Sequence, residues 1–134
     1  MAKGDIQTAV QLADRAVAID EAAIKAGEAG IYYLPTLLIN RSTVELAAAR
    51  ADQAAADASR ALNLSRDGIN PKTFSSIQGI AFLALGKALH AQGKRDQAHA
   101  AFRSAAENLQ STVGPNHPDT RSAQREAEVG THGP

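Results

Sequence analysis

Residues 82–93 read Phe-Leu-Ala-Leu-Gly-Lys-Ala-Leu-His-Ala-Gln-Gly and decide the fold, together with Ala98, Phe102 and Ala105 further along the chain. Gly86, Ala98 and Ala105 are small, so that two helix axes can approach closely, while Phe102 fills the space between them. The pattern therefore predicts two antiparallel helices joined by a turn at the end of the first stretch. At Gly86 we expect room for an alanine but not for a leucine.

The same pattern resembles the tetratricopeptide repeat, a helix–turn–helix unit that stacks on copies of itself. A second copy lies upstream, where residues 38–42 read Leu-Ile-Asn-Arg-Ser and Asp52-Gln53-Ala54 parallels Asp96-Gln97-Ala98. Residues 4–10 resemble the turn and second helix of a truncated third copy. The alanines in equivalent places are then Ala9, Ala54 and Ala98, which are 45 and 44 residues apart.

A spacing of this length resembles the longer repeats of the kinesin light chain type. Residues 113–120, Val-Gly-Pro-Asn-His-Pro-Asp-Thr, are similar to the linker that joins such repeats in bacterial multidomain proteins. The resemblance covers about residues 4–129. Glu45 departs from it, since a large apolar residue is usual there, and Ala58 stands in place of an aromatic residue. We therefore expect the first full repeat to pack more thinly than the second.

The expected fold is all-α, with antiparallel helix hairpins stacked as a short right-handed α-solenoid. Apolar periodicity and helix start and stop signals predict six helices, over about residues 5–28, 34–48, 50–65, 71–91, 95–112 and 119–129. Asn70-Pro71 is the expected start of the fourth helix. In the first helix, the large apolar residues are expected on one face: Ile6, Val10, Leu12, Val17, Ile19 and Ile24.

These elements define an expected organisation along the chain. Residues 1–30 hold the second helix of a truncated repeat, residues 34–70 and 71–117 hold two full repeats, residues 118–129 form a capping helix, and residues 130–134 form a disordered tail. Because the array begins in the middle of a repeat, we expect the chain to belong to a longer protein.

Composition excludes several classes of function. The 14 basic and 14 acidic residues give a formal net charge of zero, so neither a nucleic acid nor a membrane surface is an expected partner. The chain has no cysteine, which excludes disulfides and thiolate metal sites. No apolar run or signal peptide stands out, so a cytoplasmic protein is expected.

Catalytic chemistry is not expected either. The four histidines, His90, His99, His117 and His132, lack the spacing of a helical metal pair. No nucleophile elbow or Gly-rich phosphate loop occurs. We therefore predict no enzyme activity, no metal site and no cofactor.

The resemblance instead implies a groove formed by the first helices of successive repeats. The predicted groove residues are Thr36, Ile39, Asn40, Thr43, Leu46, Ile80, Leu83, Lys87 and His90, with Ala47, Ala84 and Ala91 between them. Asn40 matches an asparagine that binds the backbone of extended peptides in many family members. Lys87 is placed to contact an acidic side chain or a terminal carboxylate.

The predicted function is a module that binds a protein or peptide partner in this groove. The alternative is a regulatory or self-association segment, for instance a homodimerisation segment, of a larger bacterial signalling protein such as a serine/threonine kinase or a transcriptional regulator. The apolar residues of the first helix favour the alternative, and the polar residues of the groove favour the first interpretation.

Overall fold

The computed structural model describes residues 3–28, 33–66 and 75–132, the last three without their side chains. These residues form six α-helices and no strand, which confirms the all-α prediction. The helices are α1 (Lys3–Lys25), α2 (Leu34–Ala47), α3 (Ala51–Arg66), α4 (Ser76–Ala91), α5 (Arg95–Thr112) and α6 (Pro118–His132).

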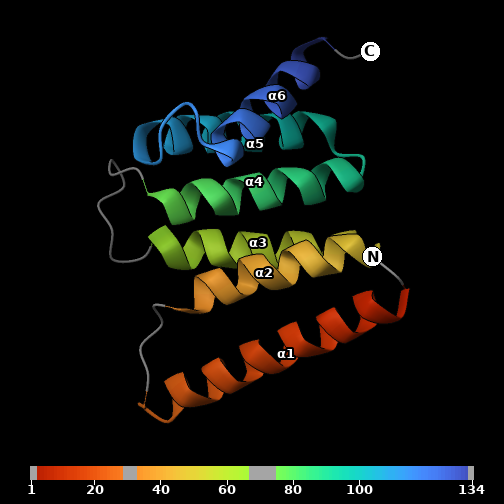
Figure 1. Cartoon of the computed structure of the whole chain (residues 1–134), viewed down its shortest axis with the longest axis vertical. Coiled ribbons are helices and arrows are strands. Elements are labelled where there is room, and N and C mark those ends of the chain that lie inside the picture. The colour runs from red at the N-terminus through yellow and green to blue at the C-terminus, as the bar shows by residue number, and fades with distance from the viewer. Residues whose placement is uncertain (1–2, 29–32, 67–74, 133–134) are drawn as a thin grey trace.

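The helices are stacked in chain order, with α1 at one end of the molecule and α6 at the other (Figure 1). Each helix packs against the next one along the chain, α2 also packs against α4, and α4 touches α6. The core is continuous along the stack, because Ile80, Phe82 and Leu85 of α4 pack against two clusters of buried residues. One cluster lies among α1 to α4 and the other among α4 to α6.

Two helix ends differ from the predictions. Helix α4 begins at Ser76, and its N-cap is Ser75, whose hydroxyl accepts a hydrogen bond from the Gln78 N–H. The predicted start at Asn70-Pro71 lies outside the described residues. Helix α6 continues to His132, so Gly130 to His132 extend a helix where a disordered tail was predicted.

The hairpins α2–α3 and α4–α5 are equivalent when offset by 44 residues. Buried positions repeat at this interval in α1, α3 and α5, as Val10, Ala54 and Ala98 and again as Val17, Ala61 and Ala105. Since 54 − 10 and 98 − 54 both equal 44, Val10 and not Ala9 is the equivalent of Ala54. The predicted spacing of 45 was therefore wrong by one residue.

The two hairpin turns repeat with the same offset. The N–H of Arg50 donates to the carbonyl of Glu45 at 2.8 Å, and the N–H of Lys94 donates to the carbonyl of Leu89 at 2.9 Å. Each turn places one residue in the left-handed region, with φ of 62° at Ala49 and 80° at Gly93. Glycine adopts this conformation without steric cost, whereas alanine does not.

We therefore expect Ala49→Gly to raise the free energy of unfolding, because it removes the strain of a left-handed alanine. The strain costs about 1–2 kcal/mol, and the greater freedom of glycine in the unfolded chain offsets about 0.4–1 kcal/mol of it. The net gain should therefore be about 0.5–1 kcal/mol, and urea unfolding would measure it. The matched variant Gly93→Ala should lower stability by a similar amount. A loss of stability in Ala49→Gly would contradict this reading of the turn.

Phe102 lies in the core between α4, α5 and α6, as predicted. Its side chain is 3% exposed and belongs to a cluster with Leu83, Leu109 and Ala123. A Cβ atom added to Gly86 would lie 2.7 Å from two carbons of the Phe102 ring. The expectation that Gly86 tolerates alanine is therefore wrong, because a rigid ring already occupies the space.

The first helix also corrects a prediction, since its apolar residues do not share one face. Val10 and Val17 are buried, whereas Leu12 and Ile19 are 59% and 63% exposed. Ile24 packs against the core of the first full hairpin. Helix α1 therefore has one apolar face directed at α2 and a second one directed away from the molecule.

Candidate functional site

A hollow of about 90 Å³ lies between α2 and α4. Six of the nine predicted groove residues line it, which are Ile39, Thr43, Leu46, Ile80, Leu83 and Lys87, and Ser42 and Ala84 complete the lining. Each helix contributes residues three and four positions apart, so that side chains one turn apart face the same space. Most of the groove residues that the resemblance implied therefore lie along this hollow.

The other three predicted residues lie elsewhere. Thr36 and Asn40 are exposed on α2 outside the lining of the hollow. His90 lines a different hollow, between α4, α5 and α6. The structure therefore brings together a shorter groove than the predicted one.

The polar groups of the α2–α4 hollow are satisfied within the protein, except for Lys87. The Ser42 hydroxyl donates to the carbonyl of Ala54 at 2.7 Å, and the Thr43 hydroxyl donates to the carbonyl of Ile39 at 3.1 Å. Lys87 is exposed and forms no ion pair with the described residues. The hollow therefore combines an apolar floor with one available cation at its rim.

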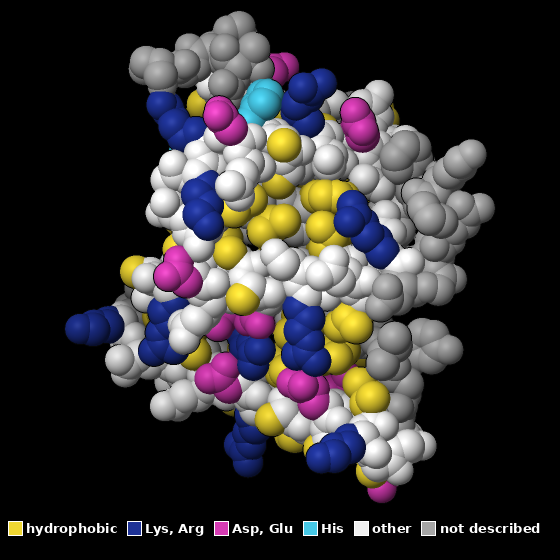
Figure 2. Space-filling view, turned by 180° about the vertical axis from the view of Figure 1, so that it is seen from behind, with side chains coloured by type: hydrophobic (Ala, Val, Ile, Leu, Met, Phe, Trp, Pro, Cys, Tyr) yellow, Lys and Arg dark blue, Asp and Glu magenta, His cyan; other side chains and the backbone are white. Residues whose placement is uncertain are grey.

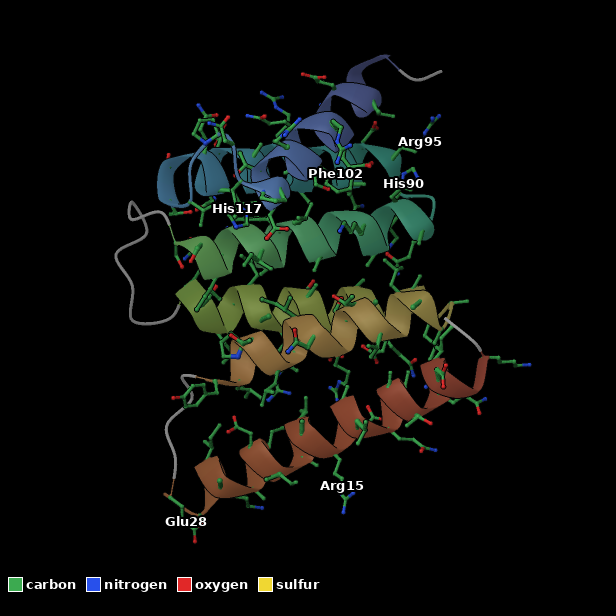
Figure 3. The ribbon with its side chains drawn as sticks, in the orientation of Figure 1. Arg15, Glu28, His90, Arg95, Phe102 and His117 are labelled. Carbon is green, nitrogen blue, oxygen red and sulfur yellow. The ribbon has the colours of Figure 1, made fainter. Side chains whose placement is uncertain are left out.

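The second hollow, also about 90 Å³, lies between α5 and the neighbouring helices α4 and α6. It is lined by His90, Arg95, Asp96, Ala98, His99, Phe102, Glu126 and Val129. Figure 3 shows His90 and Arg95 near one another at the end of α4 and the start of α5. In the preceding repeat, Leu85 packs against Ala54, Ala55 and Ala88 at this place. The hollow forms because α6 offers the shorter, exposed Val129 where α4 has Leu85.

An ionic cluster connects α1, α2 and α3. The guanidinium of Arg41 donates two hydrogen bonds to the carboxylate of Asp57, at 2.7 Å and 2.9 Å. Another nitrogen of Arg41 lies 3.5 Å from Asp14 on α1. Glu45 is only 6% exposed, and its Oε1 atom has no hydrogen-bond partner. Figure 2 shows acidic and basic side chains intermixed on the lower part of one face, below a patch of hydrophobic side chains flanked by Lys or Arg.

The pKa values of Glu45 and Asp57 are shifted in opposite directions. Burial, together with the hydrogen bond and negative charge of Asp57, raises the pKa of Glu45 to about 8. Burial also acts to raise the pKa of Asp57, but hydrogen bonds from Arg41 and Glu45 outweigh it and lower that pKa. At neutral pH, Glu45 is therefore a proton donor to the Asp57 carboxylate, which Arg41 neutralises.

This cluster was not predicted, although one signal in the sequence indicates it. With the offset of 44 residues, Arg41, Glu45 and Asp57 stand at the places of Leu85, Leu89 and Ala101. Three ionisable residues at positions that are apolar in the next repeat predict an ion-paired substitute for a hydrophobic contact. One of the two departures noted above, Glu45, is part of this exchange.

We expect stability to depend on pH through Glu45. Its pKa is about 8 in the folded protein and near 4.5 when the chain is unfolded. The folded state therefore binds more protons between these values, so the free energy of unfolding falls as pH rises through this window. Glu45→Gln mimics the protonated form and should reduce the fall by about 1–3 kcal/mol.

Thermal melts of the native chain and of Glu45→Gln from pH 4 to pH 9 would test this dependence. Glu107→Gln is a matched control, because Glu107 is an exposed residue on α5. Parallel pH profiles for the native chain and Glu45→Gln would contradict the assignment.

Two further observations concern only the part of the chain that the structure describes. It holds no group of three or more His, Asp or Glu side chains arranged to bind a metal ion. None of its helices has both the length and the apolarity needed to cross a bilayer.

Comparisons of the chain with protein family models, curated proteins and solved structures gave no match.

Proposed function

We propose that this chain is a short array of tetratricopeptide-type repeats that binds a protein segment in the hollow between α2 and α4. The observation that carries the proposal is the lining of this hollow by residues that the repeat pattern selects from the sequence alone. The equivalence of two consecutive hairpins supports the stacked, right-handed solenoid arrangement. No catalytic group is assigned, and the proposed activity is binding.

The chemistry of the hollow indicates what it would bind. Its small volume and apolar floor suit one aliphatic side chain of a peptide, which would lose its contact with water on binding. Lys87 at the rim suits a carboxylate near that side chain. The proposed ligand is therefore an extended or helical segment that carries an aliphatic residue and a nearby acidic residue.

We expect Lys87→Glu to weaken binding of such a segment by about 1–2 kcal/mol, since it replaces attraction to the carboxylate by repulsion. Peptides selected by the native chain from a random display library would serve as ligands, and their affinities would be measured by calorimetry. Lys94→Glu is the matched control, because Lys94 is an exposed lysine outside this hollow.

Ala84→Leu provides a second variant, which fills the hollow without changing its charge. It should also weaken binding, with little change in helix content. Selected peptides that lack acidic residues, or that bind both variants as tightly as the native chain, would contradict the proposal.

The second candidate is self-association, as part of a regulatory segment of a larger signalling protein. The exposure of Leu12 and Ile19 on the outer face of α1 favours it. A charge at Val10 would not test this candidate, because Val10 is buried and Val10→Glu would disturb the fold. Substitutions at Leu12 and Ile19 act on the exposed face.

A further inference from the structure

The outer face of α1 carries an apolar stripe with heptad spacing. We call the five residues of this stripe the outer stripe: Ala9, Leu12, Ala16, Ile19 and Ala23. The two large residues are exposed and the three alanines are half-buried. Figure 3 shows that Arg15, on the same side of α1, points away from the rest of the molecule. The steps of three and four residues are those of a seam between two helices.

The equivalent residues of the other two hairpins show that this stripe is particular to α1. With the offset of 44 residues, the places of Leu12 and Ile19 are taken in α3 by Ala56 and Asn63 and in α5 by Ala100 and Glu107. Those four residues are exposed, and all are small or polar. Large apolar residues at these positions are thus not needed for stacking of the hairpins.

A further helix packed before α1 in the same arrangement would not cover the outer stripe. Helix α3 is packed on both sides, by α2 and by α4. Even so, Ala56 and Asn63, at the places of Leu12 and Ile19, remain exposed. A partner that covers Leu12 and Ile19 must therefore approach from outside the stack of helices.

The outer stripe is complementary to a reversed copy of itself. If two copies of α1 run antiparallel, Leu12 of one lies opposite Ala23 of the other, and Ile19 lies opposite Ala16. Every large side chain then meets a small one, which allows the helices to approach closely and interdigitate. In a parallel pair, Leu12 would meet Leu12 and Ala16 would meet Ala16, which leaves gaps at the alanine layers.

We propose that the outer stripe of α1 pairs with the same stripe of a second copy of this chain, antiparallel, to form a symmetric dimer. This inference rests on the self-association candidate and not on the α2–α4 hollow, with which it shares no residue. The interface is isologous, because the same patch serves both copies.

Because the chain has no cysteine, introduced thiols can test the pairing in the full chain. Leu12→Cys mixed with Ala23→Cys should form a disulfide-linked heterodimer under mild oxidation. Leu12→Cys alone should not, because its two copies would be 11 residues apart along the helix pair, or about 16 Å. A linked homodimer of Leu12→Cys without the mixed product would overturn the antiparallel arrangement, but not self-association.

Sedimentation equilibrium tests the dimer itself. The native chain should show reversible dimers at high micromolar to millimolar concentration, and Leu12→Glu/Ile19→Glu should weaken them at least 30-fold. The matched control Ala56→Glu/Asn63→Glu places the same charges at the equivalent positions of α3 and should dimerise normally. Circular dichroism should show unchanged helix content in both, since all four positions are exposed. A native chain that stays monomeric throughout would overturn the proposal and the self-association candidate together, while leaving peptide binding in the hollow untouched.

Discussion

Replacing Arg41 with alanine is expected to lower the free energy of unfolding by about 3–5 kcal/mol. The variant would leave the Asp57 carboxylate, whose side chain is 11% exposed, without the two hydrogen bonds that neutralise it. Glu45, already buried without a partner for Oε1, would then face an uncompensated charge. Two-state urea unfolding would measure the loss.

The control for Arg41→Ala copies residues from the second hairpin, α4–α5. A triple variant, Arg41→Leu/Glu45→Leu/Asp57→Ala, copies the residues that stand at the equivalent places of the second hairpin. Replacing a buried ion pair by apolar residues is often neutral or stabilising, so the triple variant should be at least as stable as the native chain. If the triple variant were as unstable as Arg41→Ala, the cluster would not be a substitute for an apolar contact.

Phe102→Ala should have an effect of similar size, about 3–5 kcal/mol. The ring is 3% exposed and is shared by α4, α5 and α6, so its removal would leave a cavity where three helices meet. The neighbouring side chains cannot close the space readily, because Ala98, Ala101 and Ala105 around it are short. A chain of this size has only about 5–15 kcal/mol of stability, so the variant should be largely unfolded at moderate urea concentration.

Phe102→Leu provides the control for the cavity, since it keeps an apolar side chain of intermediate size. Its loss should be clearly smaller than that of Phe102→Ala. Equal melting temperatures for the native chain and Phe102→Ala would contradict the position of the ring in the core.

The helices could be predicted from the sequence because their signals are local. Runs rich in alanine and leucine, interrupted at Gly93 and at residues 113–118, determine where helices can form. The resemblance to the tetratricopeptide repeat implied that Ile39, Thr43, Ile80 and Lys87 share a groove, and helical spacing explains why residues of one helix face the same space. The burial of Phe102 could be predicted because a single large apolar residue among small alanines is expected to fill the space between two helices.

The remaining features depend on contacts between distant segments. No local pattern shows that Arg41 meets Asp57 and Asp14, because those residues are brought together by the packing of three helices. His90 and Leu46 occupy equivalent positions, yet Leu46 lines the α2–α4 hollow and packs against a core cluster, whereas His90 lines the second hollow beside α5. Leu12 was assigned to the same face as Val10 for a related reason: apolar character alone does not say which side of α1 meets α2.

The contact between Asp14 and Arg41 has a consequence for how the chain folds. Arg41 and Leu85 occupy equivalent places on α2 and α4, so α1 would make different contacts if it docked on α4 in place of α2. In that misplaced arrangement Asp14 would face Leu85, the equivalent of Arg41, and its carboxylate would lose its cation against an apolar surface. The ion pair therefore favours α2 over α4 as the neighbour of α1, by the modest amount expected of a partly exposed ion pair.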